Sequence, residues 1–208
     1  MYVIAVCFYY GEKGAPANVA QALVWYRRAA TGNLAIAQFD LGVMHYRGEG
    51  GLEKSDADAV RLWRLAAAAG QPEALCNLGN MFRDGRSVPQ DHAEAARHWR
   101  QAADKGDAKA EAALARAYML GRGVEKDYDA ALRLARRAAD KSNAFGELYL
   151  GTLHARGWGV PQDSRAGVRW LAKAASRGDE RVLNDLRTLA AEGLAEATEA
   201  LRRCGLAP

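Results

Sequence analysis

An alanine pair recurs along this chain at almost constant spacing. Successive pairs are 37, 36, 36 and 36 residues apart, at Ala29-Ala30, Ala66-Ala67, Ala102-Ala103, Ala138-Ala139 and Ala174-Ala175. A period of this length is typical of a solenoid of helical hairpins, in which each hairpin buries its apolar face only against its neighbours. The sequence therefore predicts an all-α repeat fold, which favours a binding scaffold.

Further positions repeat with the alanines. A leucine lies eleven residues after each pair, at Leu41, Leu78, Leu114, Leu150 and Leu186. A small residue follows it at Gly42, Gly79, Ala115 and Gly151, and a mostly aromatic position comes four residues after it, at His45, Phe82, Tyr118 and His154. Because the leucine and the aromatic share one face of a first helix, the small residue beside them lets another helix approach closely.

The second helix of each unit carries bulky residues just before its alanine pair. They are Trp25-Tyr26, Leu62-Trp63, His98-Trp99 and Trp170-Leu171, and the fourth unit has Leu134-Ala135 instead. A glycine that suits a left-handed residue ends the first helix, at Gly48, Gly85, Gly121, Gly157 and Gly193. A capping residue then begins the second helix, at Asn18, Ser55, Asp91, Asp127 and Asp163, because its oxygen accepts a free backbone N–H.

The predicted units form a single domain, 1–208. Their approximate ranges are 1–33, 34–70, 71–106, 107–142 and 143–178, followed by C-terminal helices in 179–208. The first unit is degenerate: Ala5 takes the leucine position, Val6 the small position, and Gly14 with Ala15 the turn.

These columns together resemble the Sel1-like repeat, a relative of the tetratricopeptide repeats. Leu114 to Ala139 and Leu150 to Gly178 follow the pattern Leu-Gly-x-x-aromatic-x-x-Gly-x-Gly-Val-x-x-Asp closely, with Ala115, Ala135 and Gly167 as departures. The resemblance covers nearly the whole chain. It implies a right-handed α-α superhelix of about five hairpins with a C-terminal capping helix. It also implies a non-catalytic scaffold that binds a protein or peptide in its concave groove, often in bacterial signalling.

Two other functions stay open. Some cysteine-rich relatives suggest an enzyme acting on cell-wall material or β-lactams, although this chain lacks their paired cysteines. The third possibility is a regulatory subunit that docks an enzyme through the apolar N-terminal helix.

Composition narrows the class of partner. The net charge is +4 and the pI about 9.0, with acidic residues interleaved among the arginines, which favours a solvated helical face over a nucleic-acid surface. Cys7, Cys76 and Cys204 form no recurring pair, which favours a reducing compartment. We therefore expect a cytoplasmic protein, or a periplasmic one if a signal peptide lies upstream.

The apolar segment from Met1 to Tyr10 is predicted to be a structural helix. It has no basic flank and no clear cleavage site for a signal peptide. No stretch approaches the length of a membrane span.

No set of residues with catalytic or metal-binding spacing is evident. His45 and His154 occupy the aromatic position, which argues for packing. No histidine pair has the spacing of a helical metal site and no Cys-x-x-Cys occurs. We expect no enzymatic activity, cofactor or metal.

The candidate binding surface lies opposite the buried stripe of each first helix. It comprises the positions one before, two after and six after the leucine, and we call it the first-helix stripe. Its predicted partner-binding residues are Asp40, Arg47, Asn77, Asn80, Asp84, Arg116, Tyr149, Thr152 and Arg156. Paired polar side chains at these positions could hold an extended peptide through its backbone.

The two ends of the chain differ. A helix from about Ala195 to Arg203 offers charged residues and can cap the repeat array. The first helix is apolar on more than one face, so a homodimer is predicted as one possible use of this end. The candidate self-association residues are Tyr2, Ile4, Val6 and Phe8.

Overall fold

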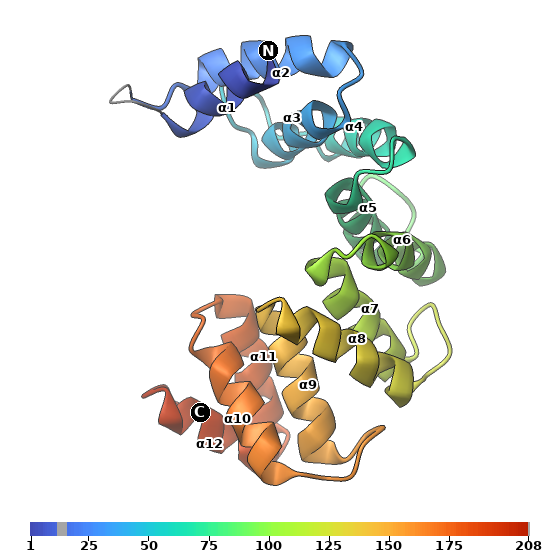
Figure 1. Cartoon of the computed structure of the whole chain (residues 1–208), viewed down its shortest axis with the longest axis vertical. Helices are drawn as coiled ribbons and strands as arrows, with labels where there is room; N and C mark the ends of the chain where they lie inside the picture. Colours follow the sequence, from blue (N-terminus) through green and yellow to red (C-terminus); the bar gives the residue numbers. More distant parts are fainter. Residues whose placement is uncertain (12–15, 208) are drawn as a thin grey trace. The chain divides into compact units, whose positions relative to one another are not determined.

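The computed structural model describes residues 1–11 and 16–207 (Figure 1). Over these residues the chain forms twelve α-helices and no strand, so the predicted all-α repeat fold is confirmed. The helices are α1 (Tyr2–Tyr10), α2 (Val19–Thr31), α3 (Ala35–Arg47), α4 (Asp56–Ala68), α5 (Pro72–Asp84), α6 (His92–Asp104), α7 (Ala108–Leu120), α8 (Tyr128–Asp140), α9 (Ala144–Arg156), α10 (Ser164–Ala175), α11 (Glu180–Ala191) and α12 (Ala195–Arg203).

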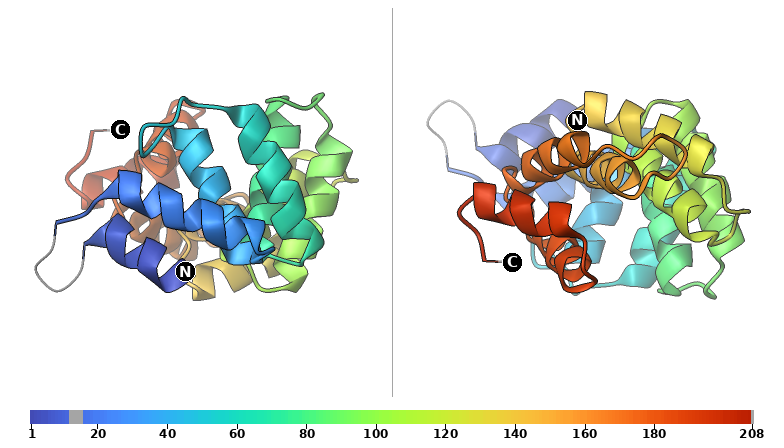
Figure 2. Two further views of the ribbon diagram at one scale, coloured as in Figure 1. Left: turned by 90° about the horizontal axis from the view of Figure 1, so that it is seen from above. Right: turned by 90° about the horizontal axis from the view of Figure 1, so that it is seen from below.

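The chain divides into two compact units, Met1–Ala102 and Ala103–Pro208, which we call unit 1 and unit 2. In unit 1, α1 and α2 lie side by side (Figure 2), and α3 packs against both α2 and α4. In unit 2, α9 packs against α7, α8, α10 and α11, and α12 lies against α10 and α11. Helix α9 is therefore the centre of the unit 2 core.

The helix ends follow the predicted signals. Each predicted capping residue accepts a hydrogen bond from a backbone N–H in the first turn of its helix, at Asn18, Ser55, Asp91, Asp127 and Asp163. Gly48, Gly85, Gly121 and Gly157 end the first helices in the left-handed conformation, where a side chain would be strained.

The first hairpin departs from this pattern. Helix α1 ends at Tyr10, and Gly11 is its C-terminal cap with φ of 72°. Ala5 is fully buried, as its position at the leucine column predicts. The predicted turn residues Gly14 and Ala15 lie outside the described residues.

The two helices of a hairpin meet where a small residue faces a large one. A Cβ atom added to Gly42 would lie 2.6 Å from Nε1 of Trp63, and one added to Gly151 would lie 2.8 Å from Cγ of Leu171. In the α7–α8 hairpin both positions are alanine, Ala115 and Ala135, and both are fully buried. The departures from the repeat pattern are thus complementary, because a methyl group appears on the first helix where the large side chain is missing from the second.

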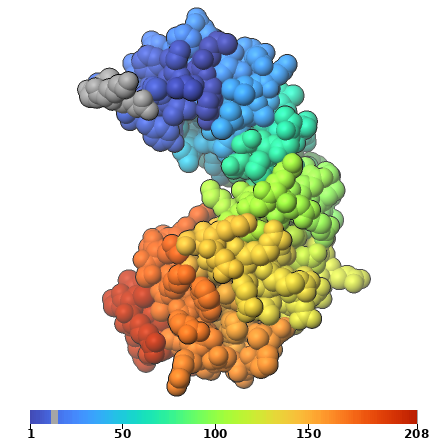
Figure 3. All heavy atoms as spheres, in the orientation of Figure 1, coloured from blue at the N-terminus to red at the C-terminus, as the bar shows by residue number. Residues whose placement is uncertain are grey.

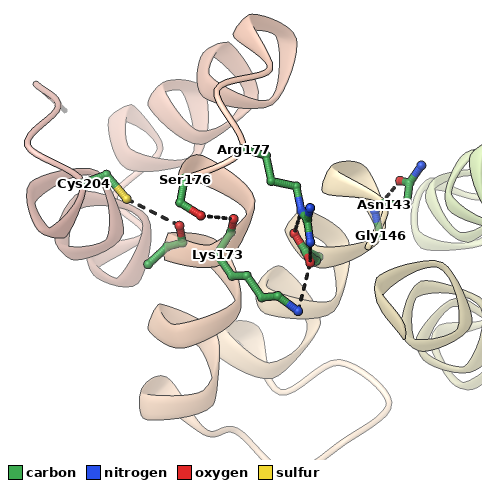
Figure 4. Close-up of polar contacts among 8 residues, drawn as sticks. Asn143, Gly146, Lys173, Ser176, Arg177 and Cys204 are labelled. Carbon is green, nitrogen blue, oxygen red and sulfur yellow. Dashed lines mark hydrogen bonds and ion pairs between the residues drawn. The ribbon is translucent and has the colours of Figure 1, made fainter. Parts of the chain in front are cut away.

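Unit 2 also contains two buried glutamate carboxylates, and each forms salt bridges with two basic side chains of its own hairpin. The Glu147 side chain on α9 is fully buried, and Lys173 and Arg177 converge on it from α10 and the residues after it (Figure 4). The ammonium of Lys173 lies 3.1 Å from Oε1, and Nε and Nη2 of Arg177 donate to the two oxygens at 2.5 and 2.6 Å. A buried carboxylate needs this full set of partners, since an unpaired charge there would be strongly destabilising.

The same arrangement recurs one repeat earlier. Glu111 on α7 is fully buried, and Arg137 at 2.7 Å and Lys141 at 2.8 Å both contact its Oε1, whereas its Oε2 has no hydrogen-bond partner among the described residues. The hairpins that have Gln38 or Leu75 at this position lack the paired cations. Their second helices carry Leu65 and Ala69, or Gln101 and Lys105, at the matching places. The carboxylate therefore appears where its hairpin supplies both cations.

The residues that follow the turn glycines Gly48, Gly85 and Gly157 each link one hairpin to the one before it, an interaction we call the clasp. Glu49 accepts a 2.7 Å hydrogen bond from the Tyr9 hydroxyl. Arg86 donates two 2.9 Å bonds to Asp56 and one of 2.7 Å to the Tyr46 hydroxyl. Trp158 stacks on Tyr128 with ring centroids 4.9 Å apart. The three clasps differ in the type of interaction, although each links two neighbouring hairpins.

The small-to-large pairing predicts that two opposite substitutions at one column both lower stability. Gly42→Ala should lower the free energy of unfolding by about 1–3 kcal/mol, because the new methyl overlaps the Trp63 ring. Ala115→Gly should also lower it, by about 1 kcal/mol, because α8 has only Ala135 to fill that space and glycine weakens a helix. Urea denaturation measures both. If Gly42→Ala were stabilising, as helix propensity alone would give, the close contact would be wrong.

The burial of the Glu147 carboxylate predicts that its ion pair contributes more to the free energy of unfolding than an exposed ion pair does. Arg177→Gln should cost about 3 kcal/mol, because it leaves the buried Glu147 carboxylate with Lys173 alone. Arg97→Gln breaks the pair with Glu94 on the exposed surface of α6 and should cost at most about 1 kcal/mol. Guanidinium denaturation of the two variants compares them, and equal losses would contradict the assigned role of Glu147.

Candidate functional site

The first-helix stripe is divided between the two units. In unit 1 it runs along α3 and α5, and in unit 2 along α7 and α9. Arg47, Asp84 and Arg116 are exposed, and Asp40, Asn77, Asn80 and Arg156 are partly buried. By helix geometry, these positions lie on the side of each first helix away from its leucine.

Tyr149 and Thr152 do not face solvent as predicted. Only 8% of Tyr149 and 4% of Thr152 is exposed. Tyr149 packs beside Phe145 in the unit 2 core, and the Thr152 hydroxyl donates to the Leu148 carbonyl at 2.9 Å. The expectation of exposure was wrong because α9 has helices on every side, so its outward positions are covered as well.

In unit 1 the stripe holds a desolvated carboxylate. Asp40 on α3 accepts a 3.0 Å hydrogen bond from the Tyr2 hydroxyl on α1. Burial raises the pKa of Asp40 above its usual range, the Tyr2 hydrogen bond opposes that rise, and the nearby Glu73 carboxylate on α5 adds to it. Burial and the Asp40 carboxylate together raise the pKa of Tyr2 to about 12, so its hydroxyl stays a donor.

Two amides continue the stripe on α5. Asn77 and Asn80 are one turn apart and both are partly buried. Neither side chain hydrogen-bonds to another residue in the described part of the chain. Each amide offers a donor and an acceptor, so the pair can engage a peptide backbone that needs both.

Two other charged residues of the unit 1 stripe form ion pairs with residues close to them in the sequence. Arg47 lies 3.4 Å from Glu49, the clasp residue that Tyr9 also contacts. Asp84 accepts bonds of 2.6 and 2.9 Å from the neighbouring Arg83 guanidinium.

In unit 2 the stripe register extends to α11, where it includes a residue that the sequence analysis missed. Asp185 on α11 occupies the same register as Asp40, one residue before the leucine Leu186. Burial raises the pKa of Asp185, and Arg116 and Arg181 partly offset that rise. The signal was present in the sequence, because the leucine column extends to Leu186.

The far end of the unit 2 stripe is an ion pair between neighbouring first helices. Arg156 on α9 lies 3.3 Å from Glu192, which follows α11. The same guanidinium lies over the Trp158 ring, 5.2 Å from its centroid. Arg156 is thereby fixed by two contacts, whereas Arg116 makes no hydrogen bond among the described residues.

A Ser–Asp–His grouping occurs at the start of α4 but has the geometry of a helix cap. Ser55 Oγ donates to Asp58 at 2.9 Å and accepts from the Asp58 N–H at 3.1 Å. Nδ1 of His45 lies 3.9 Å from the same carboxylate, and burial lowers the pKa of His45. An activated serine would instead donate to the histidine, so we assign Ser55 to capping.

The described residues, 1–11 and 16–207, contain neither a candidate metal site nor a candidate membrane-spanning helix. No group of three or more His, Cys, Asp or Glu side chains in that part of the chain could hold a metal ion. None of its helices combines the length and the apolar character that crossing a membrane requires.

The predicted self-association residues are only partly at the surface. Ile4 is exposed, whereas Tyr2, Val6 and Phe8 are half-buried against the unit 1 core.

Comparison with known proteins identifies relatives of the whole fold. The Sel1 repeat family model matches residues 1–34, 35–71, 72–107, 108–143 and 144–179. The structure is similar to that of a Sel1 repeat protein from Oxalobacter formigenes, with a TM-score of 0.79 and 32% sequence identity over 97% of this chain and 83% of that one. No curated protein sequence matches the chain significantly.

A second similar structure is a protective antigen of uropathogenic Escherichia coli strains that displays an SLR fold. The TM-score is 0.76 and the identity 30% over 97% of this chain. This chain spans 44% of the length of that protein.

The desolvated carboxylate predicts a pH-dependent effect. Because the pKa of Asp40 is raised in the folded state, that state binds its proton more tightly than the unfolded chain does, and ionisation on raising the pH lowers stability. Asp40→Asn should therefore be more stable than the unmodified protein at neutral pH. The difference should vanish in acid, where Asp40 is protonated in both states. Denaturation at a series of pH values measures it.

Asp58→Asn is the control, and its expected change in stability at neutral pH has the opposite sign. The Ser55 hydrogen bond lowers the pKa of Asp58, so the ionised group stabilises the fold above the unfolded pKa and loses that effect as the pH falls through the folded pKa. This variant should be less stable at neutral pH. Matching pH profiles for the two variants would contradict the assignment.

Proposed function

The chain belongs to the Sel1 repeat family, whose members are generally protein-interaction scaffolds, and we propose that it is a non-catalytic scaffold that binds an extended segment of a partner protein along the first-helix stripe. The observation that carries this proposal is the pair of amides on α5. Asn77 and Asn80 are partly buried, lie one turn apart and have no hydrogen-bond partner in the described residues.

The polar atoms of these amides are open to a ligand. No polar atom of Asn77 or Asn80 is both buried and unpartnered, so water solvates them in the free protein, and a bound peptide would replace that water with its own hydrogen bonds. An extended chain presents N–H and C=O groups alternately, and the amides can answer both. Their spacing along one helix face suits a peptide that runs across α5.

The carboxylates of the stripe support the same use. Asp40 in unit 1 and Asp185 in unit 2 stand at the same register position, and burial raises the pKa of both. Each is thus an acceptor that water solvates poorly, and an N–H or a cation on a partner would offset that loss. We infer that each unit offers a contact point of its own to the partner.

The experiment compares capture by matched variants. Asn77→Ala and Asn80→Ala should leave the melting temperature unchanged, because neither amide has an internal partner. The double variant should bind the captured partner about tenfold more weakly or worse, since each lost hydrogen bond is worth about 1 kcal/mol. Quantitative mass spectrometry after affinity capture, followed by calorimetry with the purified partner, measures the change.

Gln101→Ala is the matched control. Gln101 is a side-chain amide in unit 1 that is exposed on the second helix α6, away from the stripe. It should bind as the unmodified protein does. Unchanged affinity of the Asn77→Ala/Asn80→Ala variant, or an equal loss in Gln101→Ala, would remove the stripe as the binding surface.

A further inference from the structure

The second helices of unit 2 carry arginines that lack the acidic neighbour found in unit 1. Four of them are exposed on α8 and α10, and we call this set the arginine patch: Arg133, Arg136, Arg165 and Arg169. None of the four side chains forms a hydrogen bond or an ion pair among the described residues. In Figure 3, gold and orange atoms from this part of the chain lie on the surface of unit 2 that faces the viewer.

The register of the repeat shows why these charges are unpaired. In the second helices of unit 1 an acid in the first turn pairs with an arginine three residues later, as Asp58–Arg61 and Glu94–Arg97. In unit 2 an alanine takes the place of that acid, as Ala130–Arg133 and Ala166–Arg169. Unit 2 therefore has the arginines of the repeat without their local counter-charges.

Helix α10 concentrates the positive charge further. Arg165 lies one turn before Arg169, at a spacing where an acidic residue would give a favourable pair. Like charges at this spacing repel each other, so the two side chains do not stabilise the helix through their charges. An anion placed between them would remove that repulsion and accept hydrogen bonds from both guanidinium groups.

The patch extends across the first helix between α8 and α10 in the sequence. Arg136 on α8 and Arg169 on α10 both act on His154 of α9. Burial lowers the pKa of His154, and the two arginine charges lower it further against the opposing effect of Asp163. Nδ1 of His154 is buried and has no hydrogen-bond partner among the described residues. The arginine patch is therefore one positive region that spans three helices of unit 2.

We propose that the arginine patch binds an acidic segment of a second protein. Carboxylate side chains form paired, charge-assisted hydrogen bonds with guanidinium groups, which the four exposed arginines can donate. The patch lies on second helices and shares no residue with the first-helix stripe, so this inference does not depend on the function proposed for the stripe. Together the two surfaces would let one chain hold two partners.

Acidic side chains on the same helices favour a protein over a nucleic acid. Asp129 and Asp140 are exposed on α8, and Asp163 caps α10. A nucleic acid carries a phosphate at every nucleotide and would set some of them against these carboxylates. A protein segment can instead place its acidic side chains opposite the arginines alone.

Fluorescence anisotropy with labelled peptides tests the patch in the full chain. The probe is a short synthetic peptide that alternates glutamate with threonine, and its counterpart has glutamine in place of each glutamate. The glutamate peptide should bind about tenfold more tightly or better, and its affinity should fall as salt is added. Arg136→Gln/Arg169→Gln should raise its dissociation constant about tenfold or more, because two charge-assisted contacts are lost.

The variant Arg61→Gln/Arg97→Gln is the matched control. It removes the same net charge from the second helices of unit 1, where each arginine already has an acidic partner. It should leave the dissociation constant of the glutamate peptide unchanged. All four substituted arginines are exposed, so both variants should keep the circular dichroism of the parent.

Asn77→Ala/Asn80→Ala separates this inference from the function proposed for the stripe. It should leave binding of the glutamate peptide unchanged, and a loss in this variant would place the peptide on the stripe instead. Equal affinity for the two peptides, or equal losses in the two arginine variants, would overturn the proposal. An oligothymidylate that binds more tightly than the glutamate peptide and is lost in Arg136→Gln/Arg169→Gln would assign the patch to a nucleic acid.

Discussion

The approach of two helices within each hairpin depends on one steric contact, a small residue on the first helix facing a large one on the second. Trp63 fills the space left by Gly42, and Ala135 leaves room for Ala115. This contact fixes which side of the first helix turns inward, because the leucine beside the small residue must follow it into the core. The opposite side of the helix becomes the first-helix stripe. The packing that holds a hairpin together thus also sets the positions from which a partner can be bound.

The polar groups of the first helices fall into two kinds, fully buried carboxylates and partly buried stripe residues, and the difference separates structure from proposed function. Glu111 and Glu147 are fully buried and each is matched by two cations of its own hairpin. Asp40 and Asp185 are desolvated with less compensation, and Asn77 and Asn80 have no internal partner in the described residues. The matched groups lie three residues before the leucine, whereas the others lie on the stripe. The stripe residues retain hydrogen-bonding capacity that the fold does not use, which supports the proposal of an external ligand.

Local signals made the fold predictable. Caps such as Asp163, turn glycines such as Gly157 and the bounds of the last helix depend on residues within one turn, and a 36-residue period repeats them. The stripe was predicted from helix geometry alone, which cannot show how many neighbours a helix has. Tyr149 was therefore misplaced, because α9 is enclosed by four helices. Asp185 was missed although its register was visible, and the cations of Glu147 were missed because their spacing of 26 and 30 residues has meaning only once the hairpin is folded.

The clasps restrict how hairpins can be duplicated or exchanged in such a chain. The carboxylate of Glu147 and its cations belong to one hairpin, so duplication of that hairpin would copy the cluster intact. A clasp instead joins two hairpins, and each one has its own chemistry: a tyrosine with a glutamate, an arginine with an aspartate and a tyrosine, or two stacked rings. Exchanging two hairpins would set Arg86 or Trp158 against the wrong neighbour. The hairpins are alike in fold, but the clasps between neighbouring hairpins favour one order of hairpins along the chain.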